Sequence, residues 1–123
     1  MATNESAENY LETILVLSKT LPVVRSIDIA NELGFKKSSI SVAMKHLREK
    51  KHIVMDDSGY ITLTPEGKAI AEMIFERHEF ISECLIKLGV PEKIALEDAC
   101  KIEHVISKES FDAIKKYAKN FPV

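Results

Sequence analysis

A thiol, a carboxylate and an imidazole stand close together in the second half of the chain, at Cys100, Glu103 and His104. On a helix, residues three and four positions apart share one face, so these side chains would project together. Thiolate and imidazole bind late first-row divalent ions, and a carboxylate adds neutralising charge. Three donors from one helix leave coordination positions for other ligands. The run indicates part of a metal site, although such a trio also occurs as a structural or solvated feature of a helix.

Two further groups of candidate ligands lie outside this run. His78 falls on the edge of an apolar stripe, four residues after Ile74 and three before Ile81, where a buried structural histidine is the more common case. The first predicted helix carries polar side chains along one side: Glu5, Glu8, Asn9 and Glu12. That side lies opposite the apolar face and would ordinarily be solvated. Spacing alone does not join these residues to Cys100.

The elements that must position these residues follow from hydrophobic periodicity. Apolar residues at helical spacing predict helices over residues 5–19, 26–33 and 38–51, with Ser38 or Ser39 capping the third and Gly34 ending the second. Residues 52–55 and 60–63 are short β-rich runs on either side of a turn with Asp, Ser and Gly, which predicts a hairpin. Two helices joined by a short turn and followed by a hairpin form a winged helix-turn-helix.

The rest of the chain predicts three more helices. Thr64-Pro65-Glu66 provides an N-cap and a first-position proline for a long helix to about Leu88. Another helix runs from near Glu92 to Ile106, and a last one carries an apolar stripe: Phe111, Ile114, Ala118 and Phe121. Such a stripe on a short terminal helix predicts a homodimer held by the C-terminal helices. The predicted fold class is mainly α, with a winged helix over residues 1–72 followed by a helical domain over residues 73–123.

The predicted third helix and its surroundings are strongly basic. Residues 36–55 contain six Lys or Arg against one acid, a local charge of +5 in a chain whose net charge is −2. Short polar side chains at the start of a recognition helix can approach base edges, and the surrounding Lys and Arg bind phosphates. The residues expected to contact double-stranded DNA are Arg25, Lys36, Lys37, Ser38, Ser39, Ser41, Lys45 and Arg48. The alternative is that this charged face is simply solvated.

Composition narrows the class of protein. With 123 residues, 46% hydrophobic and 29% charged, the chain can bury a core without disulfides. Two cysteines are too few for a disulfide framework and fit a reducing compartment. The N-terminus is acidic where a secretory signal is basic, and no apolar run approaches the roughly 20 residues that cross a bilayer. We therefore expect a cytoplasmic location and no membrane partner.

The order of these pieces resembles one family. The runs SAENYLETI in the first helix, ERHEFI in the fourth and DACKIEHVIS in the fifth, together with the winged helix, look like the diphtheria toxin repressor and manganese transport regulator family. The resemblance covers the chain from Ser6 to about Phe121, and C-x-x-E-H is its most specific motif. It implies a homodimeric transcriptional repressor that is activated by Fe²⁺ or Mn²⁺ and binds a palindromic operator. Residues 1–72 would then bind DNA, and residues 73–123 would bind metal and dimerise.

The resemblance also implies a set of metal ligands. They fall on Glu12, His78, Cys100, Glu103 and His104. The family's other first-helix ligand falls on Asn9, a departure, because an amide oxygen can ligate a hard cation but brings no charge. A cysteine at position 100 is the iron-type choice and a carboxylate the manganese-type one, so Fe²⁺ is favoured over Mn²⁺.

Two further departures concern the rest of the family pattern. Ser82 stands where iron-type members place a carboxylate of an ancillary site, so a complete ancillary site is not expected. The chain resembles the short form that lacks an SH3-like domain.

Two other functions compete with this interpretation. One is a metal-independent winged-helix regulator in which Cys100 or Cys84 senses oxidation, since a low-pKa thiol beside His104 could react. The other is an enzyme with Cys100 as nucleophile and His104 or His78 as base. The enzyme is disfavoured because the chain has no Gly-rich oxyanion loop and its basic helix would be unexplained.

Overall fold

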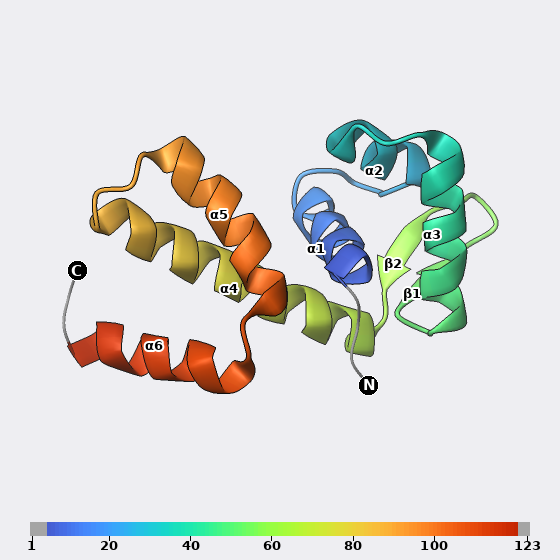
Figure 1. Cartoon of the computed structure of the whole chain (residues 1–123). Helices are drawn as coiled ribbons and strands as arrows, with labels where there is room; N and C mark the ends of the chain where they lie inside the picture. The colour runs from blue at the N-terminus through green and yellow to red at the C-terminus, as the bar shows by residue number, and fades with distance from the viewer. Residues whose placement is uncertain (1–4, 121–123) are drawn as a thin grey trace. The chain divides into compact units, whose positions relative to one another are not determined.

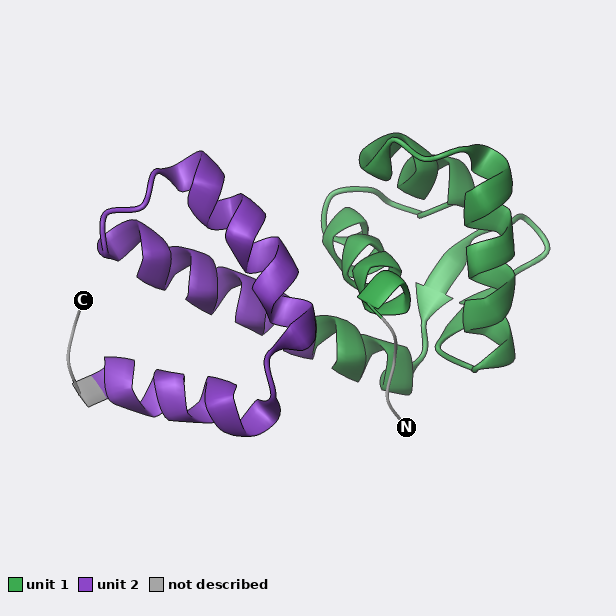
Figure 2. Cartoon of the chain, viewed as in Figure 1, with its two compact units in different colours: residues 1–72 green, residues 73–123 purple. Residues whose placement is uncertain are grey.

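A computed structural model describes residues 5–120, and the chain divides into two compact units, Met1–Glu72 and Met73–Val123 (Figure 2). Six helices and a two-stranded sheet follow one another in the order α1, α2, α3, β1, β2, α4, α5, α6 among these residues (Figure 1). The predicted fold class, mainly α with an N-terminal winged helix, is confirmed. None of the described helices is both long and apolar enough to cross a membrane.

The first unit is built from three helices and a hairpin. Helices α1 (Glu5–Ser18), α2 (Ser26–Leu33) and α3 (Lys37–Glu49) surround a core of fully buried apolar side chains: Leu11, Ile14, Ile29, Ile40, Met44 and Leu47. Gly34 ends α2 in the left-handed conformation, at φ 68°, and donates its backbone N–H to Ala30. A residue without a Cβ adopts this conformation without steric cost, so the chain can turn sharply into α3.

The wing is a short antiparallel hairpin. Strands β1 (Ile53–Met55) and β2 (Ile61–Leu63) pair with Ile53 opposite Leu63 and Met55 opposite Ile61. A third segment, which the sequence did not predict, joins its other edge: the backbone N–H of Ile61 donates to the carbonyl oxygen of Val24 at 2.8 Å. Because Val24 lies two residues before the first residue of α2, this bridge fixes the start of α2 against the wing.

The start of α4 (Pro65–Lys87) is fastened to the end of α3 by Thr64. Its hydroxyl donates to the carbonyl oxygen of Lys51 at 2.8 Å and accepts the N–H of Gly67 at 3.1 Å, as an N-cap does. Gly67 lies so close to His52 that a Cβ atom would collide with the His52 carbonyl oxygen. The small residue is therefore required by this contact. Thr64 and Pro65 act as the sequence predicted.

The second unit consists of the remainder of α4 with α5 (Glu92–Val105) and α6 (Lys108–Asn120). Ile81, Ala99 and Phe111 form its buried core, one from each helix, and Phe80 packs edge-on against Phe111 with ring centroids 5.6 Å apart. Partly buried hydrophobics complete the cluster: Leu85, Ile102 and Ile106.

The apolar stripe expected on the last helix has two environments in the structure. Phe111 is buried in the core of the unit, whereas Ile114 is exposed and Ala118 is half-buried. Phe121 lies outside the described residues. One turn of α6 therefore packs on α4 and α5, and the next presents apolar surface outward.

Candidate metal centre and nucleic-acid interface

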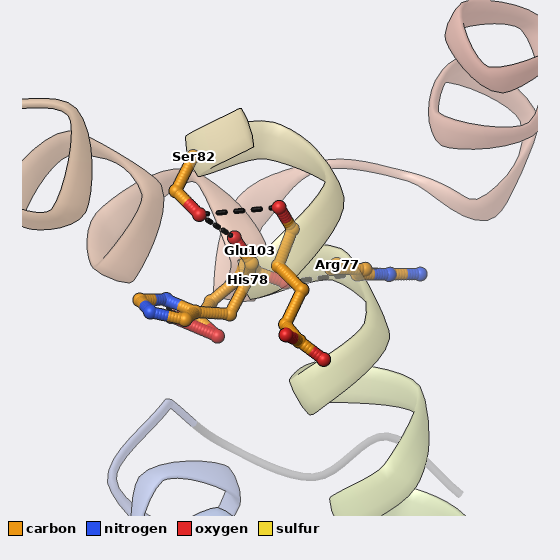
Figure 3. Close-up of polar contacts among 5 residues, drawn as sticks. Arg77, His78, Ser82 and Glu103 are labelled. Carbon is orange, nitrogen blue, oxygen red and sulfur yellow. Dashed lines mark hydrogen bonds and ion pairs between the residues drawn. The ribbon is translucent and has the colours of Figure 1, made fainter. Parts of the chain in front are cut away.

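Two side chains from different helices meet at the centre of the second unit. The Nδ1 atom of His78 on α4 lies 3.1 Å from Oε1 of Glu103 on α5 (Figure 3). Glu103 is completely buried, although it is a carboxylate, and His78 is partly exposed. Carboxylates are almost never fully buried unless they are paired or coordinate a cation. The pair therefore has the features of a functional centre.

The donors present fit a divalent cation. The second carboxylate oxygen of Glu103, Oε2, is buried and has no hydrogen-bond partner among the described residues. Glu103 and His104 offer ligand atoms within 4.8 Å of each other. An unpartnered buried oxygen of a charged group is costly, and a cation is the group that would satisfy it. Imidazole and carboxylate donors together suit first-row divalent ions.

Arg77 holds the backbone on which this centre is built. It is buried, and its Nη1 donates to the carbonyl oxygens of Glu103 at 3.1 Å and Ile106 at 2.8 Å. These carbonyls end α5, where a positive charge is favourable. Figure 3 shows Arg77 and His78 leaving α4 on different sides. The sequence analysis did not single out Arg77; the available signal was its place between Ile74 and Ile81 on the apolar stripe.

The remaining predicted ligands occupy different places. Cys100 is exposed on α5, one turn before Glu103. Among the described residues, its sulfur is not in the group of ligand atoms that includes Glu103 and His104. Glu12 and Asn9 lie on α1, in the first unit. The structure thus brings His78, Glu103 and His104 together within one unit.

Ser82 and Cys84 have no evident part in this centre. The Ser82 hydroxyl donates to the carbonyl oxygens of His78 and Glu79 within its own helix, at 2.7 and 3.1 Å (Figure 3).

Burial raises the pKa of the Cys84 thiol above its ordinary value, and the neighbouring Glu83 carboxylate raises it further. A raised pKa lowers the reactive thiolate fraction, which leaves Cys100 as the better candidate for a redox-sensing thiol.

The basic helix presents the predicted DNA-contacting residues to solvent. Ile40, Met44 and Leu47 bury one face of α3. The opposite face exposes a polar and basic set: Lys36, Lys37, Ser38, Ser39, Ser41, Lys45 and Arg48. Arg25, before α2, is exposed as well. The serine, lysine and arginine side chains of α3 are therefore accessible to a nucleic acid, while its apolar side chains are buried.

Two details of α3 differ from the sequence interpretation. Its N-cap is Lys36, with φ −68° and ψ 141°, rather than Ser38 or Ser39, which lie inside the first turn. The serine hydroxyls are therefore outward-facing residues of the helix start instead of caps. Val42, which the sequence analysis did not single out, is 57% exposed among these polar side chains. An exposed methyl-bearing side chain on such a helix can contact the methyl group of thymine.

Comparison with known protein families accounts for both units. Residues 2–69 match the iron dependent repressor N-terminal DNA binding domain, and residues 64–123 match the iron dependent repressor metal binding and dimerisation domain. Together these matches cover nearly the whole chain, and each corresponds to one half of it.

Individual relatives agree with these matches. An uncharacterised HTH-type transcriptional regulator of Methanocaldococcus jannaschii is 32% identical over 120 residues, covering 96% of each chain. The transcriptional regulator MntR of Salmonella typhimurium is 32% identical over 115 residues, covering 94% of this chain and 73% of the relative.

Solved structures agree as well. IdeR of T. acidophilum superposes with a TM-score of 0.74 at 28% identity, covering 94% of this chain and 54% of that one. A manganese-dependent transcriptional repressor in complex with manganese has the same fold, with a TM-score of 0.83 at 24% identity over 94% of this chain and 53% of its own. The chain spans about half the length of these two structures. It belongs to the iron-dependent repressor family, the family of the diphtheria toxin repressor and the manganese transport regulator.

Proposed function

We propose that this protein is a transcriptional repressor whose affinity for operator DNA is raised by a divalent metal ion. The observation that carries the proposal is the buried carboxylate of Glu103, with one oxygen on His78 and the other without a partner among the described residues. A group of this kind has no use in a purely structural core, since an apolar side chain of similar volume would serve as well or better. A bound cation would neutralise the buried carboxylate and give its second oxygen a partner.

The proposed ligands come from both halves of the chain. His78, Glu103 and His104 supply imidazole and carboxylate donors from α4 and α5, and Cys100 adds a thiolate from the same α5. Glu12, with the amide oxygen of Asn9, supplies oxygen donors from α1. An ion held by these donors would neutralise the carboxylates, and the DNA-binding unit would then depend on the ion for part of its activity.

Such a dependence couples metal binding to DNA binding. If the ion favours the arrangement in which two recognition helices match two half-sites, it raises DNA affinity by the same factor by which DNA raises ion affinity. A coupling of about 1–3 kcal/mol corresponds to a factor of roughly 5–150. In this proposal the chain's residues bind and orient without a covalent step, as expected of a regulator rather than an enzyme.

The choice of ion depends on the donor types. Nitrogen, oxygen and sulfur sites bind Fe²⁺ more tightly than Mn²⁺, and a thiolate increases the difference. Cys100 therefore favours Fe²⁺. The named relatives, in contrast, are MntR proteins, and one structural neighbour is a manganese-dependent repressor. The proposed preference for Fe²⁺ rests on Cys100 alone.

The DNA partner is an operator read by the exposed face of α3. Ser38, Ser39 and Ser41 are short enough to approach base edges near the start of the helix, and the basic side chains Arg25, Lys36, Lys37, Lys45 and Arg48 bind phosphates. A homodimer with two-fold symmetry would read a palindrome. We propose a cytoplasmic location, because the two free cysteines fit a reducing compartment.

The second unit offers apolar surface for the homodimer. Val105 at the end of α5 is 72% exposed, and Ile114 and Tyr117 on α6 are 45% and 65% exposed. Large apolar side chains exposed on a small unit are candidates for an interaction surface. Burying them against a second copy would place two DNA-binding units on one operator.

The proposal is tested by measuring operator binding with and without ion. An operator duplex is first selected from random sequences using protein saturated with Mn²⁺, and the purified chain is then titrated with it anaerobically in chelator, Mn²⁺, Fe²⁺, Co²⁺ and Zn²⁺. We expect at least one ion to raise affinity by about 5–150-fold. Equal operator affinity in chelator and in every ion would support the metal-independent regulator. If operator affinity then changed on treatment with a thiol oxidant, the redox-sensing alternative would be supported.

A further inference from the structure

Arg25 and Tyr60 form an exposed contact between the start of α2 and the wing. The Nη2 atom of Arg25 donates to the phenolic oxygen of Tyr60 at 3.3 Å. The guanidinium carbon also lies 5.0 Å from the centre of the Tyr60 ring, within the range of a cation–π contact. One side chain therefore holds the guanidinium in two ways at once.

The backbone on both sides of this contact is fixed. The N–H of Arg25 donates to Oδ2 of Asp28 at 2.8 Å, and the preceding residue, Val24, accepts the N–H of Ile61 at 2.8 Å. Val24 and Ile61 are both buried. Because Arg25 follows Val24 and Tyr60 precedes Ile61, the bridge holds the two residues side by side.

The wing itself is held by the carboxylate of Asp56. Its Oδ1 accepts the N–H groups of Ser58 and Tyr60, each at 2.9 Å, and its backbone N–H donates to the Tyr60 carbonyl oxygen at 3.1 Å. An aspartate that binds backbone two residues ahead is the usual way to order a tight turn. Tyr60 is thus presented from a defined turn.

Helix capping does not account for an arginine at position 25. It is the N-cap of α2, where Ser, Thr, Asp or Asn is favoured because its side chain accepts a backbone N–H. A guanidinium accepts nothing and places a positive charge at the positive end of the helix. Its five N–H donors form a planar fork that matches a phosphate, and the side chain is exposed.

We propose that Tyr60 is a positioning residue for DNA binding, which holds the guanidinium of Arg25 ready for a backbone phosphate. This inference rests on the proposed DNA-binding function and adds a wing residue to it. A guanidinium that is already oriented loses fewer rotamers on binding, so DNA affinity rises without a contact between Tyr60 and DNA. The wing and α2 then act together on one phosphate.

The test is a double-mutant cycle on the full chain with saturating Mn²⁺, using a fluorescein-labelled duplex of mixed sequence as the probe. Phosphate contacts are sequence-independent, so no operator is needed. Tyr60→Leu should weaken binding about two- to five-fold, within the range of the ordering cost of one side chain, and Tyr60→Phe, which keeps the ring, should bind more tightly than Tyr60→Leu. Arg25→Ala should reduce the slope of log affinity against log salt by about one. In the Arg25→Ala background, Tyr60→Leu should have no effect.

Two controls separate the possible failures. Lys93→Ala removes an exposed charge from α5 and should leave binding unchanged, whereas Lys45→Ala on α3 should lower the salt slope. The positioning role is overturned, and the DNA-binding function stands, if Lys45→Ala acts as expected and either of two results is found. In one, Tyr60→Leu has its full effect in the Arg25→Ala background; in the other, Tyr60→Leu has no effect in the wild-type background. If neither Lys45→Ala nor Arg25→Ala changes affinity or slope, the proposed DNA interface itself is wrong.

Discussion

His78 on α4 and Glu103 on α5 join the two helices through a contact of 3.1 Å between Nδ1 and Oε1, at a point where Glu103 has no exposed surface. The two residues are 25 positions apart in the chain. Their meeting places an imidazole against a carboxylate in the core of a small unit, where a fully apolar pair would be easier to accommodate. The proposed cation would use both groups as ligands.

Replacing Glu103 by glutamine separates stability from ion binding. Glu103→Gln keeps the shape but removes the buried charge that a cation would neutralise, so added ion should raise the free energy of unfolding less in the variant than in the wild type. The ion should bind at least roughly 10- to 100-fold more weakly. Calorimetric ion titration and urea unfolding measure the two effects. Glu97→Gln, an exposed change on the same helix, is the matched control. Ion binding that is equally tight in Glu103→Gln would remove Glu103 from the ligand set.

Arg77 should matter for stability more than any exposed lysine or arginine. Arg77→Met deletes the donor to two carbonyl oxygens at the end of α5, one buried and one partly buried, and the expected loss is about 2–4 kcal/mol. Urea unfolding of the apo protein measures it, with Lys101→Met on the exposed side of α5 as the control. If the two variants were equally stable, the Arg77 hydrogen bonds would not hold α5.

The connection between α3 and α4 makes opposite predictions at two neighbouring positions. Gly67→Ala should destabilise the protein by about 1–3 kcal/mol, because the added methyl group meets the His52 carbonyl oxygen. Lys51 has a left-handed backbone, at φ 63°, so Lys51→Gly should stabilise it by about 1 kcal/mol. Thermal unfolding of both variants checks the pair. The same sign of change in both would contradict this description of the connection.

The exposed face of α3 should divide into residues that set affinity and residues that set sequence preference. Lys45→Ala and Arg48→Ala should weaken binding to all duplexes alike and lower the salt slope by about one each. Ser39→Ala, Ser41→Ala and Val42→Ala should instead change the selected operator sequence, with the salt slope unchanged. Selection from random duplexes, followed by titration at several salt concentrations, distinguishes the two groups. Val42→Ala with the wild-type preference would show that Val42 does not face the bases.

Cys100 should determine which ion activates the protein. Cys100→Asp exchanges a soft donor for a hard one, so activation should shift toward Mn²⁺ without being lost. His104→Ala deletes a donor without replacing it and should make operator affinity nearly independent of any ion. Anaerobic titrations across Mn²⁺, Fe²⁺, Co²⁺ and Zn²⁺ compare the three proteins. An identical ion profile in all of them would mean that neither Cys100 nor His104 is a ligand.

Periodicity and turn residues were sufficient to predict the helices and the wing, because a buried face repeats every three to four residues in a helix. Gly34 and Thr64 carry local signals that act within a few residues, and both behave as expected. The bridge between Val24 and Ile61 was not predictable in this way, since it depends on which backbone edge lies beside the wing after folding.

In the candidate metal centre, too, local sequence signals were predictable and tertiary contacts were not. Glu103 and His104 were found from their spacing, and His78 was singled out only as an ambiguous histidine. The contact between His78 and Glu103 is tertiary, as is the use of Arg77 to hold the end of α5. An arginine inside an apolar stripe indicates a buried charge that needs hydrogen-bond acceptors. The acceptors here are two backbone carbonyl oxygens, and these have no sequence signature.

The most direct test of the central claim is the reciprocity between ion and DNA. Ion affinity is measured by calorimetry on the full chain alone and again with saturating operator duplex, and operator affinity is measured with and without the same ion. If the ion links the two functions, operator should tighten ion binding by the factor by which ion tightens operator binding, about 5–150. A factor of one in both directions, with operator bound tightly in chelator, would contradict the account.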